Sequence, residues 1–290
     1  MGGPLLVVVT GPPASGKSTI AAELGRRARL PVLAKDAIKE ILFDTLGWSD
    51  RAWSRRLGIA TYPVLYEAAA SLLRTGRSVV LEANFDNERA RRDLLALPAA
   101  RMLQVVCDAA PEVLLARFEE RARGGTRHEA HGKMDDELAA RIRRGAFGPL
   151  DLGCARFDVA TDRFEDVSLG PIVASMPSPP PCSGAPALVI VTGQSPQSRQ
   201  LAEVLEFPFI SKNTLKEHLY ETFGSGDELE QRLERAASAI LVSLVESTIA
   251  AGVSVTAESD FDAATDAAPL RALRERHDVR IVQVRAGGAD

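Results

Sequence analysis

Residues 5–18, LLVVVTGPPASGKS, decide the fold. The first part is a short run of apolar and β-branched residues, which is typical of a buried strand. The second part fits the pattern G-x-x-x-x-G-K-[ST], in which a glycine-rich turn joins a strand to a helix. Such a turn directs its backbone N–H groups inward, and the helix N-terminus adds partial positive charge. The segment therefore predicts a phosphate-binding loop.

The chemistry expected of this loop is the binding of ATP with Mg²⁺. In such loops the lysine reaches the β- and γ-phosphates and the following hydroxyl ligates Mg²⁺. Lys17 is thus the expected catalytic cation, Ser18 the expected metal ligand, and Thr19 a neighbour of the α-phosphate. A turn that matches the pattern by chance is the structural alternative. The expected nucleotide-binding residues are Gly11, Pro12, Pro13, Ala14, Ser15, Gly16, Lys17, Ser18 and Thr19.

The rest of the first half alternates strand and helix patterns. Short apolar runs occur at 31–34, 78–81, 102–107 and 156–160. Between them, apolar residues recur at three- and four-residue steps, most clearly from Trp53 to Leu72. This alternation predicts an α/β fold of the P-loop NTPase type, a parallel sheet with helices on both faces.

The sequence also repeats itself. Residues 6–11, 34–40 and 76–86 match 188–193, 211–217 and 252–262 in the same order and with similar spacing. A run rich in proline and serine, 171–186, separates the two copies and resembles a linker. We therefore expect a P-loop domain at 1–170, a linker at 171–186, and a truncated α/β domain of the same type at 187–290.

The second copy has lost the phosphate-binding pattern. Residues 193–200 read GQSPQSRQ, without the second glycine, the lysine or the hydroxyl that follows it. Arg199 stands where Lys17 does, but its bulky fork does not fit inside the loop. We expect this copy not to bind ATP in the usual way. Its sheet, with an open edge, would be completed either by forming a homo-oligomer or by packing on the first domain.

Charge is divided unevenly along the 290 residues. The net charge is −4, yet residues 1–166 carry 25 Lys and Arg against 23 Asp and Glu, and the remainder carries 10 against 16. A general nucleic-acid coat is therefore not favoured. No apolar run reaches the roughly 18 residues of a membrane span. The three distant cysteines and the lack of a leader pattern are typical of the cytoplasm.

Two carboxylates follow strand patterns at the ligand side of the expected sheet. Asp36 comes directly after 31–34, where it could accept the proton of an attacking hydroxyl. Glu82 ends 78–81 and could bind substrate or hold Mg²⁺ through water. Helix capping is the structural alternative for both residues.

Arginines gather in 114–132, LLARFEERARGGTRHEAHG. Arg117 and Arg121 lie one helical turn apart, and Arg127 follows the glycine pair at 124–125. Mobile arginines stabilise a transferring phosphoryl group, so this segment predicts a lid that closes over the nucleotide. A solvated helix face is the alternative.

The motifs GPPASGKST, KDAIKEIL, VVLEANFD and LLARFEERARGGTRHEAH together resemble the P-loop kinase group that includes polynucleotide kinases, chloramphenicol phosphotransferase and zeta toxins. The resemblance implies a strand order of 2-3-1-4-5 and a general-base role for Asp36. It places the lid pattern on Arg117 and Arg121, and a substrate contact on Glu82. Lys39 stands where the group often has arginine, as a further substrate-binding candidate. The second copy departs from the group.

These observations favour an ATP-dependent phosphotransferase, a P-loop kinase acting on a hydroxyl of a small molecule or nucleotide. Lys17, Asp36, Arg121 and Arg127 are its expected catalytic residues. One alternative is a 5′-hydroxyl polynucleotide kinase, which would need a basic groove lined by Arg89, Arg91 and Arg92. Another is an ATP-binding switch whose pseudokinase-like second domain binds a partner.

Overall fold

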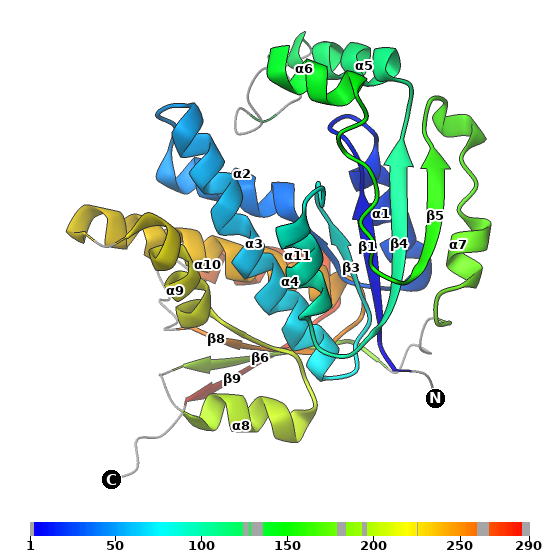
Figure 1. Cartoon of the computed structure of the whole chain (residues 1–290). Helices are drawn as coiled ribbons and strands as arrows, with labels where there is room; N and C mark the ends of the chain where they lie inside the picture. Colours follow the sequence, from blue (N-terminus) through cyan, green and yellow to red (C-terminus); the bar gives the residue numbers. More distant parts are fainter. Residues whose placement is uncertain are drawn as a thin grey trace.

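Two parallel sheets form the framework of the chain (Figure 1). The computed structural model describes residues 3–123, 128, 136–178, 184–192, 196–224, 226–259 and 267–285. The first sheet has the order β2-β3-β1-β4-β5, as the resemblance implied, and the predicted α/β class is confirmed. Its strands are β1 (Leu5–Thr10), β2 (Val32–Ala34), β3 (Val79–Glu82), β4 (Arg101–Asp108) and β5 (Ala155–Ala160).

Helices cover both faces of this first sheet because its central strands are apolar on both sides. One face packs against α1 (Lys17–Ala28) and α7 (Gly170–Ala174), and the other against α2 (Lys35–Leu46), α3 (Arg51–Arg74) and α4 (Glu88–Leu95). Helices α5 (Pro111–Arg123) and α6 (Asp136–Arg143) pack together above the carboxyl ends of the strands (Figure 1). No helix in the described ranges combines the length and apolar character needed to cross a membrane.

The second sheet has the corresponding order β7-β8-β6-β9, without a counterpart of β5 among the described residues. Its strands are β6 (Ala187–Thr192), β7 (Phe209–Ser211), β8 (Val255–Glu258) and β9 (Arg280–Arg285). Its helices are α8 (Pro196–Leu205), α9 (Lys212–Phe223), α10 (Asp227–Ala250) and α11 (Ala267–Arg276). The register also corresponds, since Leu6 lies opposite Val79 and Leu188 opposite Val255.

The segment that we expected to be a linker, 171–186, begins inside a helix of the first half. Ile172 on α7 and Met176 just beyond it are buried in the core around α1. Both side chains are large enough to remove apolar surface from water on this face of the sheet. The first structural unit therefore extends at least to Met176.

The two halves share one core. Helices α2, α3, α9 and α10 lie between the two sheets (Figure 1), and their buried side chains form a single cluster with those of both sheets. The long helices α3 and α10 bury matching positions, among them Leu57 and Leu233, and Val64 and Ile240. Each long helix thus packs on its own sheet and also on the helices of the other half.

The contacts between the halves occur in reciprocal pairs. Ser71 Oγ on α3 lies 2.7 Å from both the N and the O of Phe209 on β7. Ser247 Oγ on α10 lies 3.0 Å from Val32 N and 2.7 Å from Val32 O on β2. Both β2 and β7 are edge strands, so each serine satisfies a donor and an acceptor that the sheet leaves unpaired.

Two arginines form a second reciprocal pair of contacts between the halves. Arg56 on α3 donates to Thr222 O on α9 at 2.9 Å, and Arg232 on α10 donates to Thr45 O on α2 at 3.4 Å and to Leu46 O. A cation at the C-terminal carbonyls of a helix is also favoured by the helix dipole. The same set of contacts made once in each direction is the pattern of an interface in a twofold dimer, here within one chain.

We predict that Ser247→Ala and Ser71→Ala each lower the free energy of unfolding by about 1–3 kcal/mol, because each leaves a part-buried backbone donor and acceptor unpaired. Urea denaturation measures the change. Ser168→Ala, at an exposed serine, is the control. Equal stability of Ser247→Ala and Ser168→Ala would contradict the role of the reciprocal pair.

Candidate active site

The loop between β1 and α1 has a backbone path that requires glycine. Gly11 and Gly16 have φ angles of 149° and 76°. A Cβ atom on Gly16 would lie 2.2 Å from Phe164 Cζ, and one on Gly11 would lie 2.0 Å from Cys107 O. Both positions therefore need glycine for conformation and for space. The tight turn leads directly into α1, whose first residue is Lys17.

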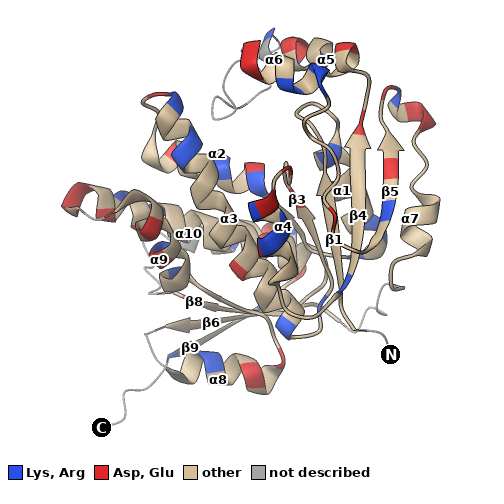
Figure 2. Ribbon diagram, in the orientation of Figure 1, with Lys and Arg blue, Asp and Glu red and all other residues tan. Residues whose placement is uncertain are grey.

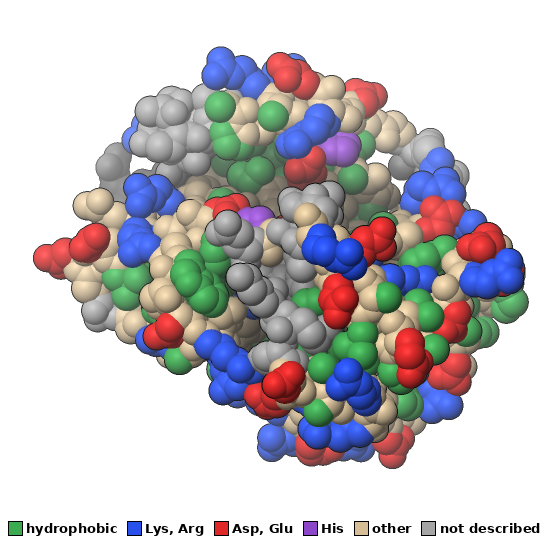
Figure 3. Space-filling view, turned by 90° about the horizontal axis from the view of Figure 1, so that it is seen from above, with side chains coloured by type: hydrophobic (Ala, Val, Ile, Leu, Met, Phe, Trp, Pro, Cys, Tyr) green, Lys and Arg blue, Asp and Glu red, His purple; other side chains and the backbone are tan. Residues whose placement is uncertain are grey.

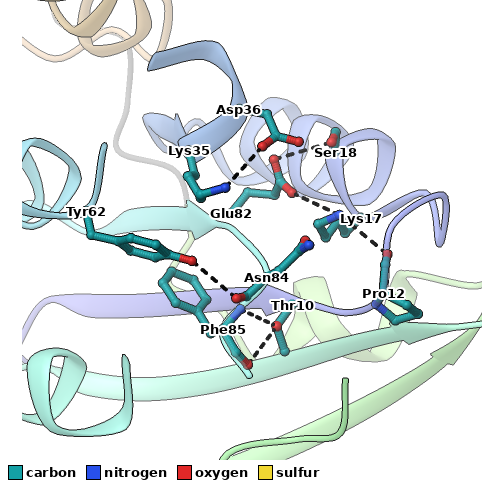
Figure 4. A network of polar contacts seen from close by, with 10 residues as sticks. All are labelled: Thr10, Pro12, Lys17, Ser18, Lys35, Asp36, Tyr62, Glu82, Asn84 and Phe85. Atoms are coloured by element: carbon teal, nitrogen blue, oxygen red, sulfur yellow. Dashed lines mark hydrogen bonds and ion pairs between the residues drawn. The ribbon is translucent and has the colours of Figure 1, made fainter. Parts of the chain in front are cut away.

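A cation, a carboxylate and a hydroxyl meet at this loop (Figure 4). Lys17 Nζ lies 3.5 Å from Pro12 O and 3.8 Å from Glu82 Oε1 at the end of β3. Ser18 donates to Glu82 Oε2 at 3.3 Å. The side chains of Lys17 and Glu82 are 7% and 1% exposed. The sheet and the loop thus bring together the residue types that bind phosphate and a divalent cation.

Buried polar atoms at the loop have unused hydrogen-bonding capacity. Within the described part of the chain, Ser15 Oγ and Glu82 Oε1 are buried without a hydrogen-bond partner. Burial raises the pKa of the Glu82 carboxyl, while Lys17 and Ser18 act in the opposite direction. Buried polar groups in native proteins are nearly always satisfied, so these atoms fit a site that binds a polar ligand or a cation.

The two candidate carboxylates are not the capping residues of their helices. The N-cap of α2 is Ala34, without a side-chain cap, and Asp36 lies in the first turn with 41% of its side chain exposed. The N-cap of α4 is Asn87, which accepts from Ala90 N at 2.9 Å. Asp36 and Glu82 lie on the same side of the loop (Figure 4), and the charge of Asp36 adds to the rise in the pKa of Glu82.

Lys35 and Tyr62, which the sequence analysis did not select, also belong to this site. Lys35 Nζ lies 3.6 Å from Asp36 Oδ1 and 5.7 Å from the centre of the Tyr62 ring. Tyr62 donates to Asn84 O at 3.3 Å, and burial raises the pKa of its hydroxyl, which keeps it a donor at neutral pH. Lys39 donates to Ser54 Oγ at 3.1 Å. The available signal for Lys35 was its repetition as Lys212.

The arginine segment is placed only in part. Arg117 donates to Thr161 O at 2.6 Å and to Asp162 O at 2.9 Å, and its guanidinium lies 4.8 Å from the Phe164 ring centre. Arg121 is exposed near the end of α5. Arg127 lies outside the described residues. The structure therefore brings Arg117 beside the loop through its contacts with the chain after β5.

Thr161 and Phe164 support the phosphate-binding loop from outside. Thr161 Oγ1 lies 2.8 Å from Ser15 O and 3.0 Å from Asp108 O. The Phe164 ring lies where a side chain on Gly16 would project. Sequence reasoning missed both residues, although Thr161 directly follows a recognisable strand. Phe164 gave no sequence signal.

Two arginines of the suggested basic groove, Arg89 and Arg91, are engaged by other residues of the chain. Arg89 lies 3.7 Å from Asp93, and Arg91 lies 3.1 Å from Glu88 and donates to Asp151 O at 2.6 Å. Acidic and basic residues alternate along α4, α5 and α6 (Figure 2). Both signs are also interspersed on the face seen from above in Figure 3. These pairs are typical of a solvated helix face.

The second half differs at the corresponding positions. Residues 193–195 lie outside the described residues, but the guanidinium of Arg199, at the position of Lys17, lies 5.0 Å from the centre of the Phe209 ring. Ser198 stands in place of Gly16 and is buried. Asn213 stands in place of Asp36. The lysine and the aspartate of the first site are thus replaced in the second half, whereas Glu258, buried at the end of β8, corresponds to Glu82.

Comparison with known proteins is consistent with this geometry. A family model described as "AAA domain" matches residues 6–144. A chain from Chloroflexus aurantiacus described as a "putative kinase" is 38% identical, with a TM-score of 0.55, over 59% of this chain and 95% of that chain. None of the curated proteins matches the chain.

Two further solved structures are more distant. APS kinase CysC from Mycobacterium tuberculosis, in complex with AMPPNP and APS, is 18% identical over 60% of this chain and 95% of that chain, with a TM-score of 0.38. A chain of the Pnkp1/Rnl/Hen1 RNA repair complex is 14% identical over 100% of this chain and 98% of that chain, with a TM-score of 0.38.

We predict that Gly16→Ala abolishes measurable ATP binding and also destabilises the fold, because a positive φ costs about 1–2 kcal/mol for a non-glycine residue and the new Cβ meets Phe164. Calorimetric titration and thermal unfolding measure the two effects. Gly76→Ala is the matched control, since Gly76 has a φ of 70° and a Cβ added there would meet no atom within 4 Å. Equal behaviour of the two variants would show that the Phe164 contact is unimportant.

Proposed function

This chain belongs to the P-loop kinase-like family of AAA domains, and from that premise we propose that it transfers the γ-phosphate of ATP to a hydroxyl of a small molecule or nucleotide. The observation that carries the proposal is the convergence of Lys17, Ser18 and Glu82 at a phosphate-binding loop, with Asp36 on the same side (Figure 4). The first structural unit, which extends at least to Met176, supplies these groups.

In the proposed complex the loop amides and Lys17 bind the phosphates of ATP. Lys17 is held near Glu82 and Pro12 and can move from these weak contacts to the β- and γ-phosphates. Ser18 and Glu82 would hold Mg²⁺, Glu82 through water. The bound ion would supply neutralising charge on the phosphate oxygens. The buried, unsatisfied atoms Ser15 Oγ and Glu82 Oε1 fit this occupancy.

Asp36 is proposed to act on the acceptor. Its carboxylate is partly exposed at the start of α2 and faces the side of the loop where Ser18 and Glu82 lie (Figure 4). As the acceptor oxygen attacks the γ-phosphorus, the carboxylate accepts the hydroxyl proton. The bond between the γ-phosphorus and the β–γ bridging oxygen breaks, and ADP leaves with that oxygen. Lys39, one turn further along α2, is proposed to contact the acceptor.

The arginines are proposed to have two separate roles. Arg117 fixes the chain at 161–164 against the phosphate-binding loop by its two carbonyl contacts. Through this position it borders the nucleotide. Arg121 and Arg127 would approach the phosphates when the segment after α5 closes, and would stabilise the charge of the transferring group.

We propose that the second half is a tandem copy without nucleotide chemistry, which supports the acceptor side of the first. Ser247 holds Val32 on β2, and Arg232 holds the C-terminal end of α2. Asp36 lies between these two supported points. The second half thus fixes both ends of the segment that carries the proposed base.

We predict that Lys17→Ala weakens ATP binding by about 10- to 100-fold, the loss expected when a charge-assisted hydrogen bond is removed. Calorimetric titration with MgATP measures this change. Arg199→Ala, at the corresponding position of the second half, should leave ATP affinity unchanged. If ATP affinity fell with Arg199→Ala but not with Lys17→Ala, the nucleotide would bind in the second half, and the proposal would be rejected.

We predict that Asp36→Asn, which installs the residue found at position 213, lowers acceptor-dependent ADP production by about 10²- to 10⁴-fold while ATP affinity changes little. The amide cannot accept the hydroxyl proton. A panel of hydroxylated acceptors (sugars, nucleosides, oligonucleotides) provides the measurement. A fully active Asp36→Asn enzyme would reject the assignment of the base, and ATP binding without any acceptor-stimulated turnover would favour a binding switch.

A further inference from the structure

The second half contains a cavity between its sheet and the helices α10 and α11. The cavity has a volume of about 40 Å³, and about 470 Å³ when the space at its open side is included. A single water molecule needs only roughly 10–15 Å³. Two hydroxyl groups belong to the lining, those of Ser238 on α10 and of Ser259 directly after β8. The apolar side chains of the lining include Leu188, Ile190, Leu241, Val245, Leu270 and Leu273.

The first half fills the corresponding place with aromatic rings. Helices α3 and α10 are both 24 residues long and correspond end to end, as their reciprocal contacts with the opposite halves show. By this correspondence, Ser238 stands in place of Tyr62 and Val242 in place of Tyr66. The ring centres of Tyr62 and Tyr66 lie 5.9 Å apart, and they lie 6.2 Å and 6.5 Å from that of Phe85. The second half has therefore lost two rings of a packed cluster.

The other walls do not make up for this loss. Strand β8 has Ala257 where β3 has Leu81, which removes a further large side chain. In the other direction, Val245 and Ile190 are larger than their counterparts in the first half, but only by methyl-sized groups. The counterpart of Phe85, Phe261, lies outside the described residues. The cavity thus lies where the first half has larger side chains, between elements that are otherwise arranged alike.

Such a space is suited to a small aromatic molecule. Protein interiors are normally close-packed, and side chains that line an empty space lose dispersion contacts on that side. A cavity lined by apolar side chains can regain these contacts by binding an aromatic ring. The hydroxyl groups of Ser238 and Ser259 can each donate and accept a hydrogen bond. A ring that carries a hydroxyl group matches both parts of this lining.

We propose that this cavity is a binding site for a small phenol, which takes the place that the tyrosine side chains occupy in the first half. The ring packs between the sheet, α10 and α11, and its hydroxyl group bonds to the serine hydroxyls. Among the described residues of the lining none is charged, so an ionised compound would lose its hydration without gaining a partner. The site lies in the second half and does not depend on the proposed phosphotransferase function.

Calorimetric titration of the full chain with p-cresol, the tyrosine side chain as a free molecule, tests the proposal. We expect saturable binding to the wild type, and weaker binding of toluene, which lacks the hydroxyl group. Ser238→Tyr restores the residue of the first half and should weaken p-cresol binding by about 10- to 100-fold, because its own ring fills the cavity. Arg235→Tyr adds the same side chain at an exposed position of α10 and should bind p-cresol as the wild type does.

Two further variants make the test independent of how well Ser238→Tyr folds, since added volume can destabilise a core. Val242→Tyr introduces the ring at the other position and should also prevent binding. Ser238→Ala combined with Ser259→Ala keeps the cavity and removes both hydroxyl groups. It should lower the affinity for p-cresol by about 2- to 10-fold and leave that for toluene unchanged.

Three results would overturn the proposal. The first is the lack of saturable p-cresol binding to the wild type. The second is equal p-cresol affinity in the wild type and in a folded variant that carries the added ring at Ser238 or Val242. The third is toluene binding as tight as that of p-cresol, which would show that the hydroxyl group is not recognised.

Discussion

The arrangement of the two halves depends on how the unpaired backbone groups of two short edge strands are satisfied. β2 and β7 each end a parallel sheet, so each presents backbone groups that no strand pairs. A serine on the long helix of the opposite half satisfies one donor and one acceptor on each strand. These bonds fix the four-helix layer between the sheets, because each serine lies within a helix that also packs on its own sheet. The common core follows from this constraint.

The two halves share the same scaffold but carry different residues at the phosphate-binding loop and at the start of the following helix pair. The interface serines and arginines occur in both, as do the strand order and the buried positions of the long helices. The groups that would act on a nucleotide differ, with Arg199 stacked on Phe209 and Asn213 in place of an aspartate. Packing residues are constrained by neighbours on every side. Site residues, which contact a ligand, can change without disturbing the core.

Sequence patterns predicted what is local. The phosphate-binding loop, the strand runs and the long helical stripes depend on neighbouring residues, and the strand order came from the resemblance. Packing of the second half on the first was one of two alternatives that the sequence left open. It could not choose between them, because Ser247 and Val32 are 215 positions apart and no periodicity links them. The sequence could not show whether Asp36 is the N-cap of α2 or a site residue, because that depends on the residue at which α2 begins. Phe164 was missed because its role is to fill the space beside Gly16, which no sequence pattern shows. Most of α7 was hidden within the proline-rich segment 171–186.

The reciprocal interface has a consequence for how such a molecule can change. In a twofold homodimer every substitution appears twice, once in each subunit, so a residue that fills a cavity in one copy fills it in both. Here the two faces belong to one polypeptide, and the covalent connection keeps them together at any dilution. Asp36 and Asn213 occupy corresponding places in the two halves with different side chains. A single chain can therefore change a residue in one half without changing its counterpart in the other.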